Sequence, residues 1–268
     1  MNEIARHVLR WIEDAIAAAP EGHVPLLFLS GPQGSGKSTA LAEAMAALAV
    51  PVAGASVDDF YLTHEAREVL ARTISPLFGT RGPPGTHDLG LLHETVEALR
   101  AAPDGATTLV PVFDKLADDR KPPSAWRRFH GRPAAIVIEG WLMGVDADPA
   151  APLAAPLNAV EAADAAGDWR RAQEDALATD YAALWDMADG FLHVVAPGFE
   201  CVRDWRLQQE AGLWEARGET MPPARRDWVD EFIQHYERLT RRMIAGSRRP
   251  GAEIHIDKDR RVIRTSGR

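Results

Sequence analysis

Residues 31–39 are Gly31-Pro32-Gln33-Gly34-Ser35-Gly36-Lys37-Ser38-Thr39. The first eight match the pattern G-x-x-x-x-G-K-[ST] at every fixed position. Glycines let backbone N–H groups turn inward around phosphate oxygens, at the positive end of the helix that follows. We therefore predict that residues 31–39 bind the phosphates of ATP or GTP, that Lys37 reaches the outer phosphates, and that Ser38 offers its hydroxyl to Mg²⁺. An ordinary glycine-rich turn is the alternative interpretation.

The segments around this loop indicate a buried sheet. The apolar run 24–30 precedes the loop and predicts a strand buried on both faces, as parallel sheets contain. Further strands are expected at 52–57, 108–113, 134–139, 191–195 and 253–257, and helices at 2–19, 37–48, 91–100, 158–188, 201–217 and 225–244. Strands that alternate with helices predict an α/β fold with a mostly parallel sheet flanked by helices.

We interpret residues 1–268 as one domain. Residues 2–19 place apolar side chains at helical spacing, which predicts an amphipathic helix packed on the body of the protein. Residues 116–133 are expected to form a surface insert and residues 145–157 a surface connection. The basic C-terminal tail is expected to be a frayed end.

The composition excludes several classes of protein. The chain has 268 residues, a formal net charge of −9 and one cysteine, Cys201. One cysteine excludes an intramolecular disulfide and fits a reducing compartment. The negative charge argues against a broad nucleic-acid-binding face, and no apolar run approaches the ~18 residues of a membrane-spanning helix. We expect a cytoplasmic protein that binds neither nucleic acid nor a membrane.

Acidic residues follow two of the expected strands. Glu139 ends the strand 134–139, where a second carboxylate of the Mg²⁺ site is expected in a nucleotide-binding fold. Asp58 and Asp59 follow the strand 52–57, and an acid there can orient an attacking hydroxyl and accept its proton. A surface glutamate and a helix-capping aspartate are the alternatives. No Asn-Lys-x-Asp motif is present, which disfavours GTPase switches.

Five further segments carry a family resemblance. They are residues 56–63 (Ser-Val-Asp-Asp-Phe-Tyr-Leu-Thr), 81–88 (Arg-Gly-Pro-Pro-Gly-Thr-His-Asp), 113–115 (Phe-Asp-Lys), 138–141 (Ile-Glu-Gly-Trp) and 205–210 (Trp-Arg-Leu-Gln-Gln-Glu). Together with the loop they resemble the P-loop D-glycerate 3-kinase family, which is related to uridine kinase, pantothenate kinase and phosphoribulokinase. The resemblance runs in order from about residue 24 to residue 257 and implies a P-loop kinase fold with a helical lid.

The resemblance also implies roles for individual residues. Lys37, Asp58, Arg203 and Arg206 are expected to be catalytic, with Asp58 as general base and the two arginines on a lid, one turn apart, facing the phosphates. Ser38 and Glu139 are the expected metal ligands. The expected substrate-binding residues are Asp59, Tyr61, Arg81, His87, Asp88, Asp114 and Lys115.

Each of these roles has a structural alternative. Arg81 is the first candidate for a substrate carboxylate, because a guanidinium can bind both oxygens, but a surface arginine in a loop is the alternative. His87 could be a turn residue, and Asp114 and Lys115 could pair with each other on the surface. For Arg203 and Arg206 the alternative is a solvated basic face.

The activity implied by the resemblance is transfer of the γ-phosphoryl group of ATP, bound with Mg²⁺, to D-glycerate, giving 3-phosphoglycerate and ADP. A kinase of another small hydroxylated acceptor, similar to uridine or pantothenate kinase, is one alternative. A nucleotide-binding regulatory protein without kinase activity is the other. The set of Lys37, Ser38, Asp58 and Glu139 argues against the regulatory protein, because a sensor does not need the aspartate.

Overall fold

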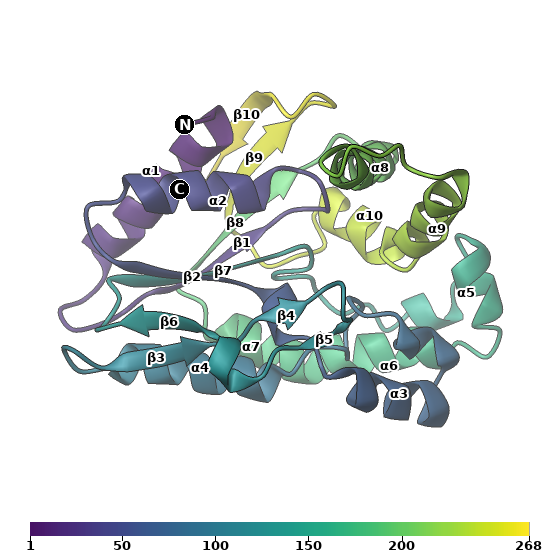
Figure 1. The fold of residues 1–268 in the computed structure, drawn as a ribbon, viewed down its shortest axis with the longest axis horizontal. Coiled ribbons are helices and arrows are strands. Elements are labelled where there is room, and N and C mark those ends of the chain that lie inside the picture. The colour runs from purple at the N-terminus through teal and green to yellow at the C-terminus, as the bar shows by residue number, and fades with distance from the viewer. Residues whose placement is uncertain (268) are drawn as a thin grey trace.

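The computed structural model describes residues 1–267, which form a central six-stranded sheet in the order β10-β9-β8-β1-β7-β2 (Figure 1). The strands are β1 (Leu26–Ser30), β2 (Val52–Ser56), β7 (Ala135–Gly140), β8 (Gly190–Val195), β9 (Ala252–Ile256) and β10 (Val262–Ser266). Neighbouring strands are parallel except β10, which is antiparallel to β9. The predicted α/β fold with a mostly parallel sheet is confirmed.

Helices cover both faces of this sheet. Helices α1 (Glu3–Ala18) and α2 (Lys37–Ala47) lie on one face, whereas α4 (Leu89–Ala101) and α7 (Ala182–Asp186) lie on the other (Figure 1). Every residue of β1 and β7 is therefore buried, which explains their continuous apolar sequences. The amphipathic helix is confirmed as α1, which buries Ile4, Val8 and Ile12 and is capped by the side chain of Asn2.

Three helices gather beyond one end of the sheet: α8 (Phe199–Glu215), α9 (Pro223–Gln234) and α10 (Glu237–Ala245) (Figure 1). The sequence predicted one helix over 225–244, which is wrong. The helix breaks at His235 and Tyr236, and Tyr236 has φ of −106°. The apolar spacing continues across the break, so periodicity does not detect it. Among residues 1–267 no helix is long and apolar enough to cross a membrane.

The expected helix over 158–188 is also divided. It consists of α5 (Ala159–Ala163), α6 (Asp168–Ala176), a π-helical turn (Leu177–Tyr181) and α7. Gly167 separates α5 from α6 with φ of +74°, a conformation that glycine adopts without strain. The sequence analysis did not predict α3 (His64–Thr73), which is capped by Thr63.

The strand expected at 108–113 lies outside the central sheet. Strand β3 (Thr107–Val110) pairs antiparallel with β6 (Arg127–His130), and it stops before Pro111, which has no N–H to donate. Residues 113–120 form a small hairpin of β4 (Phe113–Asp114) and β5 (Asp119–Arg120). The segment 116–133, expected as a surface insert, thus contributes two strands that pair with preceding residues.

The C-terminal end is a strand and not the expected frayed tail. Strand β10 pairs with β9, the strand that the sequence predicted at 253–257. The turn between them places Arg260 at φ of +63°, an uncommon conformation for a residue with a side chain. This hairpin reaches the phosphate-binding loop, as described below.

Candidate active site

The predicted phosphate-binding loop joins β1 to α2. Gly34 and Gly36 have φ of +73° and +89°, in the left-handed region that disfavours other residues. Gly36 is also the residue before α2, and no side chain caps this helix. The first N–H groups of α2 therefore remain available for an anion, as a nucleotide phosphate site requires.

The lysine and serine that follow the loop meet the acid at the end of β7. The hydroxyl of Ser38 donates to Glu139 Oε1 at 2.8 Å, and Lys37 Nζ lies 3.4 Å from Glu139 Oε2. Strand β7 lies between β1 and β2, so that Glu139 is level with Leu29 on one side and Ser56 on the other. The carboxylate is thereby fixed beside the loop, as the sequence predicted.

A divalent cation fits these residues. Glu139 is buried, and its Oε2 has no hydrogen-bond donor among the described residues. A hydroxyl and a carboxylate are the oxygen ligands that Mg²⁺ accepts, with phosphates and waters completing its six positions. Within residues 1–267 no three His, Cys, Asp or Glu side chains form a metal site of their own. The cation would therefore be held jointly by Ser38, Glu139 and the nucleotide.

Asp58 lies in a short 3₁₀ helix (Val57–Phe60) at the end of β2. Its Oδ1 accepts a hydrogen bond from the Tyr61 hydroxyl at 2.7 Å, and its Oδ2 lies 2.7 Å from Lys115 Nζ. Burial alone would raise the pKa of Asp58, but the charges of Lys115 and Lys37 and the two hydrogen bonds hold that pKa well below its ordinary value. Asp58 is therefore ionised, and it lies within electrostatic range of the P-loop lysine.

Arg81 lies next to Lys115, the partner of Asp58. It forms an ion pair with Asp118, its guanidinium lies 5.7 Å from the centre of the Phe113 ring, and it donates to the carbonyl of Lys115 at 3.4 Å. The Tyr236 hydroxyl donates to the Arg81 carbonyl at 2.7 Å. The structure therefore brings Arg81, from the loop before α4, against the hairpin of β4 and β5, which carries Lys115 to Asp58.

His87 is connected to Asp58 through Tyr61, whose ring centre lies 4.8 Å from that of His87. His87 is buried, and its Nδ1 lies 2.5 Å from the Tyr181 hydroxyl. Burial lowers the pKa of His87 to about 4, so the ring is neutral at pH 7. His87 and Asp88 also line a cleft of about 510 Å³ between the start of α4 and residues 176–184.

Three of the predicted substrate-binding carboxylates have structural partners. Asp59 caps the 3₁₀ helix at Ser56 and pairs with Arg127 at 2.7 Å. Asp88 caps α4 and pairs with Arg120 at 2.9 Å. Asp114 accepts from the backbone N–H groups of residues 116 and 117. Their binding roles stay predictions, because each carboxylate has a structural role in the fold.

The two lid arginines differ in burial and in their partners. Arg203 is half-exposed and binds both oxygens of Asp230 on α9, each at 2.8 Å. Arg206 is largely buried, lies 3.1 Å from Glu210 Oε2, and its guanidinium lies 5.6 Å from the Phe232 ring centre. Burial lowers the pKa of Arg206, and the charge of Arg81 adds to this lowering. Arg206 is thus within electrostatic range of Arg225 and of Arg81.

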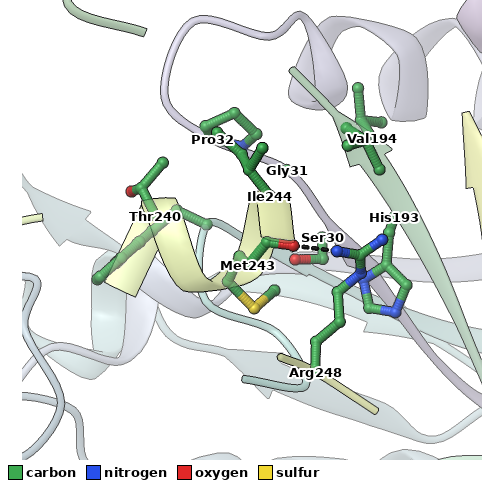
Figure 2. Close-up of a pocket in the computed structure, with 11 residues that line it drawn as sticks. Ser30, Gly31, Pro32, His193, Val194, Thr240, Met243, Ile244 and Arg248 are labelled. Atoms are coloured by element: carbon green, nitrogen blue, oxygen red, sulfur yellow. Dashed lines mark hydrogen bonds between the residues drawn. The ribbon is translucent and has the colours of Figure 1, made fainter. Parts of the chain in front are cut away.

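A small cavity lies under the loop, and Figure 2 shows its lining. It is lined by the loop residues Ser30, Gly31 and Pro32, by β8 and by α10, and Arg248 donates to the carbonyl of Met243 there. Its volume of about 10 Å³ is that of one water molecule. Thr240 Oγ1 and His193 Nδ1 line this region without partners among the described residues, so one water would suit it, and a substrate would not fit.

Several residues of the site were not predicted. Asp118 and Tyr236 hold Arg81, Glu210 holds Arg206, and Trp205 and Arg260 contact the loop. Trp205 and Glu210 belong to the 205–210 motif, in which only Arg206 had a predicted role. The other three lie in segments with no motif, so their positions depend on tertiary structure alone.

The ends of β1, β7 and β2 thus bring together a phosphate loop, its lysine and serine, and two acids, which is the arrangement of a P-loop kinase. Comparisons with known proteins agree with this class. The uncharacterized kinase mug58 of Schizosaccharomyces pombe is 32% identical over 248 residues, covering 87% of this chain and 85% of that protein. No protein-family model matches the chain.

Two further relatives define the family more narrowly. The chloroplastic D-glycerate 3-kinase of Arabidopsis thaliana is 32% identical over 247 residues, which are 85% of this chain and 51% of that protein, so the chain spans about half its length. The structure of D-glycerate 3-kinase from Cryptococcus neoformans has the same fold, with a TM-score of 0.82 and 23% identity over 99% of both chains. The chain belongs to the family of P-loop kinases that includes these D-glycerate 3-kinases.

Proposed function

We propose that this kinase transfers the γ-phosphoryl group of ATP to the 3-hydroxyl of D-glycerate, giving 3-phosphoglycerate and ADP. The observation that carries the proposal is an ionised Asp58 that pairs with Lys115 and lies within electrostatic range of the P-loop lysine, with Arg81 hydrogen-bonded to the carbonyl of Lys115. D-Glycerate carries a hydroxyl that Asp58 can orient and a carboxylate that Lys115 and Arg81 can bind. The named activity of the plant and fungal relatives supports this choice of acceptor.

The acceptor hydroxyl is oriented by Asp58. In the structure this carboxylate is paired with Lys115. A glycerate carboxylate competes with Asp58 for Lys115 and with Asp118 for Arg81, so binding of the acceptor frees Asp58 to accept a hydrogen bond from the 3-hydroxyl. The proton passes to Asp58 as the bond to phosphorus forms. Because bond formation is late in a loose phosphoryl-transfer transition state, orientation matters more here than strong basicity.

The remaining groups bind and neutralise the phosphates. Backbone N–H groups of the loop and the ammonium of Lys37 bind the β- and γ-phosphates. Ser38 and Glu139 hold Mg²⁺, which neutralises phosphate charge when it is bound. Arg206, which is largely buried and within electrostatic range of Arg81, would neutralise charge on the transferred group, whereas Arg203 is half-exposed and binds Asp230. Positioning and charge neutralisation thus account for most of the catalysis.

The proposal is tested by measuring ADP release with Mg·ATP and a panel of acceptors: D-glycerate, L-glycerate, pantothenate, uridine and ribulose 5-phosphate. D-Glycerate should give the highest kcat/KM, and NMR of the product should show phosphate on carbon 3. Turnover of another acceptor at a higher kcat/KM would replace glycerate as the proposed substrate but leave the kinase activity in place.

We also propose a cytoplasmic location, because the chain has a single cysteine, as suits a reducing compartment. Cell fractionation tests this location.

A further inference from the structure

The carbonyl of Gly34, at the tip of the phosphate loop, is bound from outside the loop by a residue of the C-terminal hairpin. Arg260 Nε donates to the Gly34 carbonyl at 2.6 Å. When the N–H groups of such a loop turn inward toward phosphate, the carbonyls turn outward and need donors there. The guanidinium of Arg260 supplies one.

The same guanidinium also contacts helix α8. It donates to Gln208 Oε1 at 3.1 Å, and its carbon lies 5.0 Å from the centre of the Trp205 ring. Trp205 in turn donates from its indole N–H to the carbonyl of Lys258 at 2.8 Å. The turn between β9 and β10 is therefore joined to α8 by two residues, Lys258 and Arg260, which both contact the buried Trp205.

Trp205 also touches the loop directly. A Cβ atom added at Gly34 would lie 2.5 Å from Trp205 Cβ, so the backbone of Gly34 lies directly against α8. The loop tip is thus enclosed by α8 on one side and bound by Arg260 on the other. Any shift of the tip must break the Arg260 hydrogen bond or move Trp205.

The backbone of Arg260 shows that this contact is kept against a local cost. Its φ of +63° is disfavoured for a residue with a Cβ atom, whereas glycine or asparagine would adopt it more readily. Strained backbone of this kind persists where the surrounding structure holds it and where it serves a site. Here the conformation directs the side chain to Gly34, Gln208 and Trp205.

We propose that Arg260 is a positioning residue of the nucleotide site: with Trp205 it holds the loop tip in the conformation that binds the phosphates. Arg260 need not touch the nucleotide to do so. The contribution acts on nucleotide binding, and it does not depend on which acceptor the kinase uses.

The test compares Arg260→Asn and Arg260→Lys with the neighbouring control Arg261→Asn. Asparagine tolerates the left-handed backbone and lacks the guanidinium. The melting temperature of Arg260→Asn should therefore equal or exceed that of the wild type. Lysine keeps the charge but cannot make the forked contacts of Arg260. Arg261 is exposed, and its backbone N–H donates to Asp257 within the hairpin.

Titration calorimetry with Mg·ADP measures binding without any acceptor, and steady-state kinetics measure both KM values. We expect Arg260→Asn to weaken Mg·ADP binding and raise the KM for ATP about tenfold, as loss of a charged hydrogen bond does, with the acceptor KM unchanged. The Mg·ADP affinity and the KM for ATP of Arg260→Lys should lie between those of the wild type and Arg260→Asn. Arg261→Asn should match the wild type in both quantities.

Two results would overturn the proposal. One is wild-type Mg·ADP affinity in Arg260→Asn. The other is a parallel loss of both substrates' affinities with a lowered melting temperature, which is the signature of a general structural role. If Arg260→Asn does not fold, Arg260→Lys decides: a rise in the KM for ATP alone supports the proposal, and an unchanged or parallel response contradicts it.

Discussion

Lys115 Nζ lies 2.7 Å from Asp58 Oδ2, so the hairpin of β4 and β5 places an ammonium group on the carboxylate that faces the P-loop lysine. Asp58 raises the pKa of Lys115, and Lys115 lowers that of Asp58. The side chain of Lys115 is largely exposed, so it can leave when an acceptor arrives. The pair links recognition of an acidic acceptor to activation of its hydroxyl.

Removal of the Asp58 carboxylate should leave ATP binding intact and slow turnover. Asp58→Asn keeps the size of the side chain but cannot accept a proton. We expect kcat to fall by about two to four orders of magnitude, the usual effect of losing a general base, with the KM for ATP nearly unchanged. Steady-state kinetics with D-glycerate provide the measurement. Unchanged turnover would remove Asp58 from the mechanism.

Removal of Lys115 should affect both acceptor binding and pH dependence. Lys115→Met deletes the ammonium that lowers the pKa of Asp58, so that pKa rises and the acidic limb of the kcat/KM profile moves to higher pH. The KM for glycerate should rise about tenfold, because one cation of the carboxylate site is lost. Lys121→Met is the matched control, since Lys121 lies near Asp114 and not Asp58. An acidic limb at the wild-type pH would contradict the pairing.

The two lid arginines should be separable. Arg206→Ala is expected to lower kcat about a hundredfold, because we propose that Arg206 neutralises charge on the transferred group and an electrostatic donor to the transition state has about this effect. Arg203→Ala should change kcat by less than about threefold, since its partner is Asp230. Glu210→Gln should lower kcat as well, but by less than Arg206→Ala does, because buried Glu210 binds Arg206 from one turn away on the same helix. Equal effects of the two alanine variants would show that the lid rearranges on nucleotide binding.

Much of the nucleotide site could be predicted because its signals are local. The loop needs only eight consecutive residues. Glu139 lies at the end of β7 and Asp58 follows β2, and the carboxyl ends of these strands meet at one edge of a parallel sheet. The helix-capping alternative applies to Asp59, which forms the capping box, and not to Asp58. The neighbouring acids look alike in sequence, and only the fold distinguishes them.

The rest depends on contacts between distant segments. The partners of Arg81 are distant in sequence: Asp118 lies 37 positions away and Tyr236 lies 155 positions away. Strand β3 has a strand-like sequence, but tertiary pairing places it with β6 and not in the central sheet. The basic C-terminal residues looked like a solvated tail, because no local pattern shows that Arg260 reaches Gly34.

Acid should destabilise the fold through two buried histidines. Burial lowers the pKa of His87 and of His193 to about 4, below the ordinary value of 6.5. The unfolded chain therefore binds more protons below pH 6.5, and each histidine's contribution to stability is lost as the pH falls from about 6.5 to 4. A shift of this size corresponds to roughly 3 kcal/mol of unfolding free energy for each histidine. Urea unfolding at pH 7 and pH 5 measures the loss, and His87→Gln should reduce the pH dependence by the contribution of one histidine. Equal pH slopes in wild type and His87→Gln would show that His87 is protonated in the folded protein, as it would be if solvent reached Nε2.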